Sequence, residues 1–201
     1  MIKGEETRYA ILKKGLEMAS NLGLECVTIG NLAKKMNMSK SGLFAHFQSK
    51  ENLQIAILDY AHDEFREHVI LPALRTERGI QRIKALVENW IKWGSQLTGG
   101  CIFVIAGTEF SNREGKVRDC LMKQQDEWID CLQRIAQSAI KAGDFRKDID
   151  CKQFAFDLYS LLLGFHYYDR LLQNGNTKDK QEAALQRLLD DYRPSVLHVN
   201  Q

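Results

Sequence analysis

The chain has 201 residues, a length that suits one medium domain or two small ones. Apolar residues make up 44% of it and only two residues are proline, which excludes collagen-like, linker-rich and disordered chains. The formal net charge is +2, but residues 1–50 hold eight Lys or Arg and four Asp or Glu, a net of +4. This basic N-terminal segment favours a local contact with phosphates, with chance variation as the simpler alternative.

The five cysteines are odd in number, form no CxxC pair, and make no metal pattern with the histidines. We therefore expect reduced thiols, no metal and no cofactor, and the sequence leaves a redox role for Cys101 or Cys120 open. The charged start, MIKGEETRYAILKK, lacks the apolar run of a secretory signal. No apolar run is long enough to cross a bilayer, so we expect a cytoplasmic protein with no membrane partner.

Apolar residues recur at helical spacing along almost the whole chain, which predicts an all-α fold of about nine helices. The helices expected in the N-terminal part cover residues 5–22, 29–36, 40–47 and 51–71. Each of the last three follows a hydroxyl residue that can cap it, namely Thr28, Ser39 and Ser49. Pro72 should kink or end the fourth helix because proline cannot donate a backbone hydrogen bond.

The helices become longer after Pro72 and are separated by glycine-containing breaks. The pattern predicts helices over residues 76–97, 101–110, 116–142, 151–172 and 178–192. In the N-terminal part, the two short helices are joined by a three-residue turn over residues 37–39. This arrangement is typical of a helix-turn-helix, whose second helix needs only about two turns to enter a DNA groove.

The segment TIGNLAKKMNMSKSGLFAHFQSKENL, residues 28–53, resembles the DNA-binding signature of the tetracycline-repressor (TetR) family of bacterial regulators. The shared elements are the initial Thr, the Leu-Ala pair, Ser-Lys after the turn, Leu-aromatic-x-His-Phe, and Ser-Lys-Glu-x-Leu. About a quarter of the chain carries this close similarity, and the remainder is similar mainly in the number, lengths and order of its helices.

The resemblance implies an all-α homodimer with one DNA-binding and one ligand-binding and dimerisation domain per chain. We place an N-terminal three-helix helix-turn-helix domain at residues 1–50 and a connecting helix at residues 51–71. A C-terminal helical domain for ligand binding and dimerisation then covers residues 72–201. The expected partners are a double-stranded DNA operator, a second copy of the chain and an unknown small-molecule effector.

Candidate DNA contacts combine donors for phosphates with side chains that can reach base edges. They are Thr28, Ser39, Lys40, Ser41, Gly42, Phe44, His46 and Lys50. Thr28 can bind an anion at a helix start or act only as a cap, and Lys40 suits a guanine edge or a phosphate. Lys50 should reach a backbone phosphate. A solvated surface charge is the alternative for both lysines, and local capping is the alternative for His46.

The segment departs from the family pattern at three positions of the recognition helix. In the family, two aromatic residues, usually tyrosines, often precede the histidine. Here these two positions are occupied by Phe44 and Ala45. Gly42 stands where a Thr or Asn is often found. Because Phe44 cannot donate a hydrogen bond and Ala45 can touch only a methyl group, the helix has a reduced capacity to read bases.

The C-terminal part carries more large aromatic residues than a minimal helical bundle needs. By resemblance, a pocket between its helices would bind a small molecule, and aromatic walls suit an apolar or aromatic one. The candidate ligand-binding residues are Trp90, Trp93, Phe103, Glu109, Phe110, Trp128 and His166. Simple core packing is the alternative for each aromatic residue. Glu109 and His166 could instead pair with Arg113 and Arg170 at a surface.

The last two helices are the expected dimer interface, because in the family two such helices from each subunit form a four-helix bundle. The residues expected to face the partner are Phe154, Leu158, Leu161, Phe165, Leu185, Leu188 and Leu189.

Taken together, the residues and the resemblance predict a ligand-responsive regulator of transcription. We expect a repressor that binds a palindromic operator as a homodimer and is released by a small apolar or aromatic molecule. A helical small-molecule-binding protein with weak or non-specific DNA binding is the alternative, and Gly42 and Ala45 favour it. The chain has no GxSxG, HExxH, P-loop or GxGxxG motif, so we do not expect an enzyme.

Overall fold

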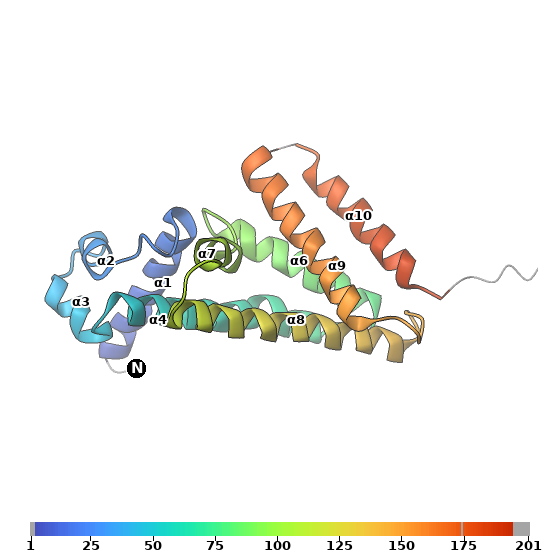
Figure 1. The fold of residues 1–201 in the computed structure, drawn as a ribbon, viewed down its shortest axis with the longest axis horizontal. Coiled ribbons are helices and arrows are strands. Elements are labelled where there is room, and N and C mark those ends of the chain that lie inside the picture. The colour runs from blue at the N-terminus through green and yellow to red at the C-terminus, as the bar shows by residue number, and fades with distance from the viewer. Residues whose placement is uncertain (1–2, 174, 195–201) are drawn as a thin grey trace, which may run out of the picture. The chain divides into compact units, whose positions relative to one another are not determined.

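The structure is a computed structural model that describes residues 3–173 and 175–194. Every regular element in these residues is helical, and uninterrupted helical runs number nine, which confirms the predicted all-α fold (Figure 1). The first elements are α1 (Lys3–Leu22), α2 (Ile29–Lys35), α3 (Lys40–Phe47), α4 (Lys50–Phe65), a π-helical turn (Arg66–Ile70) and α5 (Leu71–Leu74). The others are α6 (Ile80–Gln96), α7 (Ile102–Phe110), α8 (Lys116–Ala142), α9 (Cys151–Tyr167), a second π-helical turn (Tyr168–Leu172) and α10 (Thr177–Tyr192).

The described residues form two compact units. The first comprises those of Met1–Val69 and Ile91–Asp126, and the second those of Ile70–Trp90 and Glu127–Gln201. The three unit boundaries therefore fall inside the first π-helical turn, α6 and α8. Segments distant in the sequence belong to one unit, and in particular α7 belongs to the same unit as α1 to α4.

In the first unit, α1 packs on α4, and α2 packs on α3 (Figure 1). Gly15 of α1 lies so close to Ile57 of α4 that an added Cβ would meet its side chain at 2.6 Å. The core of the helix-turn-helix is fully buried at Leu32, Leu43 and Leu53. Burying such side chains contributes about 1.5–3 kcal/mol each, enough to hold helices this short in place.

Two helix boundaries differ by more than two residues from those that periodicity predicts. The helix expected from Thr76 begins at Ile80, whose N–H donates to Oδ2 of Asp144 at 2.8 Å after Gly79 takes a φ of 95°. An acceptor from another segment therefore sets this start. Pro72 does not end the helical run. The π-helical turn interrupts the regular α geometry just before it, and Pro72 then lies in the first turn of α5, where a proline is tolerated.

In the second unit, α9 and α10 lie side by side (Figure 1). Their lower ends meet through three rings, with centroid distances of 5.0 Å between Phe154 and Tyr192 and 5.1 Å between Phe154 and Phe145. The Tyr192 hydroxyl donates to Oδ2 of Asp157 at 2.7 Å. Burial and this bond to a carboxylate raise the pKa of Tyr192. The unit is therefore held mainly by apolar and aromatic packing between long helices.

Candidate nucleic-acid interface

Three hydroxyl side chains cap α2, α3 and α4 as predicted. Thr28 Oγ1 accepts the N–H of Asn31 at 3.1 Å, and Ser39 Oγ accepts the N–H of Gly42 at 3.0 Å. Ser49 caps α4 in the same way. A capping hydroxyl still has its own proton to donate, so capping and a phosphate contact are compatible at Thr28 and Ser39.

The turn between α2 and α3 is tight because one residue adopts a left-handed conformation. Asn37 has a φ of 54°, which asparagine tolerates better than most residues. The N–H of Met38 then donates to the carbonyl of Ala33 at 2.9 Å. A second left-handed residue, Gln48, ends α3 with a φ of 65°. Asn37 therefore shapes the turn before α3, and Gln48 ends α3 after eight residues.

The two faces of α3 differ sharply. Leu43 and Phe47 are buried in the core, whereas Ser39, Lys40, Ser41, Phe44 and Ala45 are exposed. Phe44 is 51% exposed, although phenylalanine is more often buried. The predicted DNA-contact residues of α3 therefore share one open face, while Gly42 and His46 lie half-buried at its edges.

Arg8 of α1 supports the end of α3, and no sequence motif indicated this role. Its guanidinium lies 4.7 Å from the centre of the Phe47 ring, and Nη1 donates to the carbonyl of His46 at 3.1 Å. A cation at a helix C-terminus is favoured by the helix dipole. The distance of 38 positions between Arg8 and His46 explains why sequence spacing could not reveal the pair.

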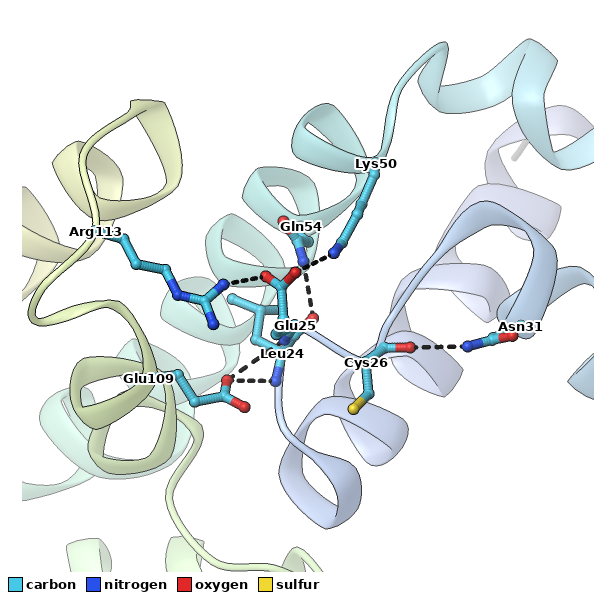
Figure 2. A network of polar contacts seen from close by, with 8 residues as sticks. All are labelled: Leu24, Glu25, Cys26, Asn31, Lys50, Gln54, Glu109 and Arg113. Atoms are coloured by element: carbon cyan, nitrogen blue, oxygen red, sulfur yellow. Dashed lines mark hydrogen bonds and ion pairs between the residues drawn. The ribbon is translucent and has the colours of Figure 1, made fainter.

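Lys50 lies half-buried at the start of α4, and its ammonium is already engaged. Nζ contacts Oε1 of Glu25 at 2.5 Å, and Oε2 of the same carboxylate contacts Nη1 of Arg113 at 2.6 Å (Figure 2). The hydrogen bond from Lys50, followed by the charges of Lys50 and Arg113, lowers the pKa of Glu25 against the opposing effect of burial. Sequence reasoning missed Glu25, and it did not connect Arg113 with the DNA-binding segment.

The predicted ligand residue Glu109, on α7, is used within the first unit. Its Oε2 accepts the N–H of Leu24 at 2.7 Å and that of Glu25 at 3.4 Å (Figure 2). Gly23 leaves room for it, since an added Cβ there would collide with the Glu109 carboxylate. Phe110 is buried below the guanidinium of Arg113, 5.0 Å from its ring centre. Both residues therefore belong to the surroundings of the turn between α1 and α2.

The other predicted ligand residues are divided between the two units. In the first unit, Trp93 and Phe103 both pack edge-on against Phe65, at 6.0 and 5.6 Å. In the second unit, Trp90 lies 6.4 Å from His166, whose pKa is lowered by burial and then by Arg170. Trp128 packs on Tyr159 there. Neither unit by itself brings all seven predicted residues together.

Most residues expected at the dimer interface are buried within their own chain. Those with at most 8% exposure are Phe154, Leu158, Phe165, Leu185 and Leu189, whereas Leu161 and Leu188 are half-buried. A different face of α9 and the following π-helical turn carries exposed apolar side chains. These are Phe156, Leu163, Tyr167, Tyr168, Leu171 and Leu172. The helical periodicity was correct, but it cannot tell which of two apolar stripes meets the chain's own core.

The described residues contain neither a cluster suited to a metal ion nor a helix suited to a membrane. In that part of the chain, no group of three or more His, Cys, Asp or Glu side chains is placed to hold a metal ion. None of the helices among the described residues has both the length and the apolar character needed to cross a membrane.

Two family models match the chain. Residues 11–57 match the bacterial regulatory proteins of the tetR family, and residues 79–185 match the tetracyclin repressor-like C-terminal domain. The second match alone covers more than half of the chain, so the chain belongs to the TetR family of transcriptional regulators.

Individual relatives agree with this assignment. The chain is 20% identical over 191 residues to the HTH-type transcriptional regulator SrpR of Pseudomonas putida, covering 94% of this chain and 85% of SrpR. Its fold is similar to that of a TetR transcriptional regulator from Chloroflexus aurantiacus, with a TM-score of 0.84, 23% identity and coverage of 97% and 100%. AibR, crystallised with isovaleryl coenzyme A and operator DNA, has a TM-score of 0.70, 23% identity and coverage of 93% and 98%.

Proposed function

We propose that this regulator is a repressor that binds a palindromic operator as a homodimer and is released by a small apolar or aromatic molecule. The open face of α3 carries the proposal, because Ser39, Lys40 and Ser41 are exposed together at the helix start. The helix N-terminus favours phosphate, and a lysine there can reach a phosphate or a guanine edge. Residues 1–50 would bind DNA, and residues 72–201 would bind the effector and the second subunit.

An exposed apolar stripe supports the homodimer. Phe156, Leu163, Tyr167 and Leu171 recur at helical spacing and are 68%, 37%, 55% and 64% exposed. Contiguous apolar side chains on a surface mark an interaction site, because leaving them in water is unfavourable. A two-fold axis would let the same stripe pack against itself and would present two α3 helices to successive major grooves.

Support for an apolar effector comes from the side chains and from one structural relative. Trp90 and Trp128 are buried in the second unit, and Trp93 and Phe103 are buried in the first. Large apolar side chains of this kind suit an apolar ligand. AibR shows that a protein of similar fold binds both operator DNA and an acyl coenzyme A. The effector of this chain would share the apolar character of such an acyl group.

Fluorescence anisotropy tests the central claim. The purified protein would be titrated with a duplex from upstream of its own gene and with a shuffled duplex of the same composition, across a salt series. We expect tight binding to the native duplex alone. Equal and steeply salt-dependent binding to both would favour the alternative, a small-molecule-binding protein whose α3 contacts only phosphates. Gly42 and Ala45 would then be the reason, because neither has a side chain that can donate a hydrogen bond to a base.

A further inference from the structure

The carboxylate of Glu25 lies between two cations from different parts of the chain. Lys50, at the start of α4, contacts one oxygen, and Arg113, in the loop after α7, contacts the other (Figure 2). Lys50 is also the residue expected to reach a DNA phosphate. If Lys50 contacted Glu25 and a phosphate at the same time, the three N–H donors of its ammonium would be divided between them.

The backbone that carries Glu25 is fixed by three side chains. Glu109 accepts the N–H of Leu24, and the buried amide of Gln54 donates to the Leu24 carbonyl at 2.9 Å. Asn31 donates to the carbonyl of Cys26 at 3.1 Å (Figure 2). The turn is thus held from α7, α4 and α2. Because the backbone on both sides of Glu25 is held in this way, its carboxylate stays within reach of both cations.

We propose that Glu25 sets the DNA affinity of this regulator by competing with phosphate for Lys50, and that Arg113 weakens this competition by binding the same carboxylate. The inference rests on the proposed DNA binding. Lysine is suited to exchange, since its ammonium is compact, strongly hydrated and carried by a flexible stem. Arg113 is suited to remain, because its guanidinium also lies over the Phe110 ring.

The exchange leaves no bare carboxylate next to the DNA backbone. When Lys50 turns to a phosphate, Arg113 still neutralises Glu25, so the repulsion between Glu25 and the phosphates stays small. The side chains of Lys50, Glu25 and Arg113 are 39%, 39% and 46% exposed, so the effect is moderate. We expect about a three-fold change in DNA affinity for one DNA-binding segment and about a ten-fold change for a dimer that carries two of them.

The test uses the full-length protein and a mixed-sequence duplex that spans two successive major grooves, at low salt. Glu25→Gln keeps the shape of the side chain and removes its charge, so Lys50 is released and affinity should rise about ten-fold. In a Lys50→Ala background the same change should have no effect, because the competition no longer exists. Glu51→Gln, next to Lys50 at the start of α4, is the matched control for a general loss of negative charge.

Arg113→Gln tests the second half of the proposal. Glu25 then has Lys50 as its remaining partner in this group, so affinity should fall about ten-fold. In a Glu25→Gln background the loss should disappear. A loss that persists there would show that Arg113 acts through its own charge on DNA, which would overturn its assigned role.

Several results would overturn the role of Glu25. These are an equal gain in DNA affinity from Glu25→Gln with and without Lys50, a gain no larger than that of Glu51→Gln, or no gain at all.

Carboxyl carbon NMR of the unmodified protein gives a check that needs no variant. The pKa of Glu25 should rise when DNA binds, because Lys50 is the main cause of its lowering; an unchanged pKa would overturn the exchange. Failure of the wild type to bind any duplex would instead remove the proposed function itself.

Discussion

In the segment from α1 to α4, the helices α2, α3 and α4 each begin with a side-chain cap, and the turn before α2 is held by hydrogen bonds from α2, α4 and α7. The α9–α10 pair meets instead through aromatic rings packed edge to face, and one face of α9 is apolar and exposed. Directional bonds fix orientation, whereas apolar area provides free energy without a preferred angle. The difference suits the proposed roles, in which the first segment presents one helix face to DNA and the α9–α10 pair binds a second subunit.

The largest expected effect is loss of the ring cluster in the second unit. Phe154 is fully buried and contacts Phe145 and Tyr192, so Phe154→Ala should lower the free energy of unfolding by about 3–5 kcal/mol. Urea unfolding followed by circular dichroism measures this. A loss below about 1 kcal/mol would show that the cluster does not stabilise the unit as we describe.

Phe156 is the matched partner of Phe154 on the same helix, two positions away and 68% exposed. Phe156→Lys should leave the helical content unchanged and weaken the dimer by about 2 kcal/mol, the effect of losing an interface anchor. Analytical ultracentrifugation across a concentration series checks this. A dimer as stable as the wild type would place the subunit contact on a different face.

Tyr192→Phe removes the hydrogen bond to Asp157 and should cost about 1.5 kcal/mol. Because the folded state raises the pKa of Tyr192 above its ordinary value of 10, this stability is present below pH 10 and lost as the pH rises further. The free energy of unfolding, measured from neutral to alkaline pH, should therefore decline in the wild type and decline less in the variant. Parallel curves for the two proteins would contradict the role of this bond.

Ser39→Ala tests the capped segment and should cost about 1 kcal/mol, because the N–H of Gly42 loses its acceptor. Thermal unfolding gives the stability, and Ser39→Asp, which can still cap the helix, is the control. Equal losses in the two variants would mean that capping is not what Ser39 contributes.

The smallest effect on stability is expected at Lys50, whose ion pair with Glu25 is partly exposed. Lys50→Ala should instead weaken binding to all DNA sequences and reduce the slope of log affinity against log salt by about one. Anisotropy titrations at several salt concentrations measure the slope. An unchanged slope would remove Lys50 from the phosphate contacts and sharpen the contrast between binding and folding roles in this segment.

The agreement between sequence and structure is closest where the controlling signal is local. The bounds Lys40–Phe47 and Lys116–Ala142 coincide with the predicted helices, because a cap or a glycine next to the helix sets them. The predicted start of α6 was wrong because Asp144, which accepts the N–H of Ile80 at the observed start, lies 64 positions away. Periodicity also could not divide the apolar residues of α9 between the chain's own core and an exposed stripe.

The sequence by itself determined the all-α fold, the helix-turn-helix and the family, since these depend on caps, helical spacing and a contiguous motif. Only the tertiary structure decided that Glu109 supports the turn before α2, that Arg8 holds the end of α3, and that Lys50 shares Glu25 with Arg113. Each of these contacts joins residues at least 25 positions apart. Their pairing depends on how α1, α4 and α7 pack, and packing is a property of the folded chain that no local pattern contains.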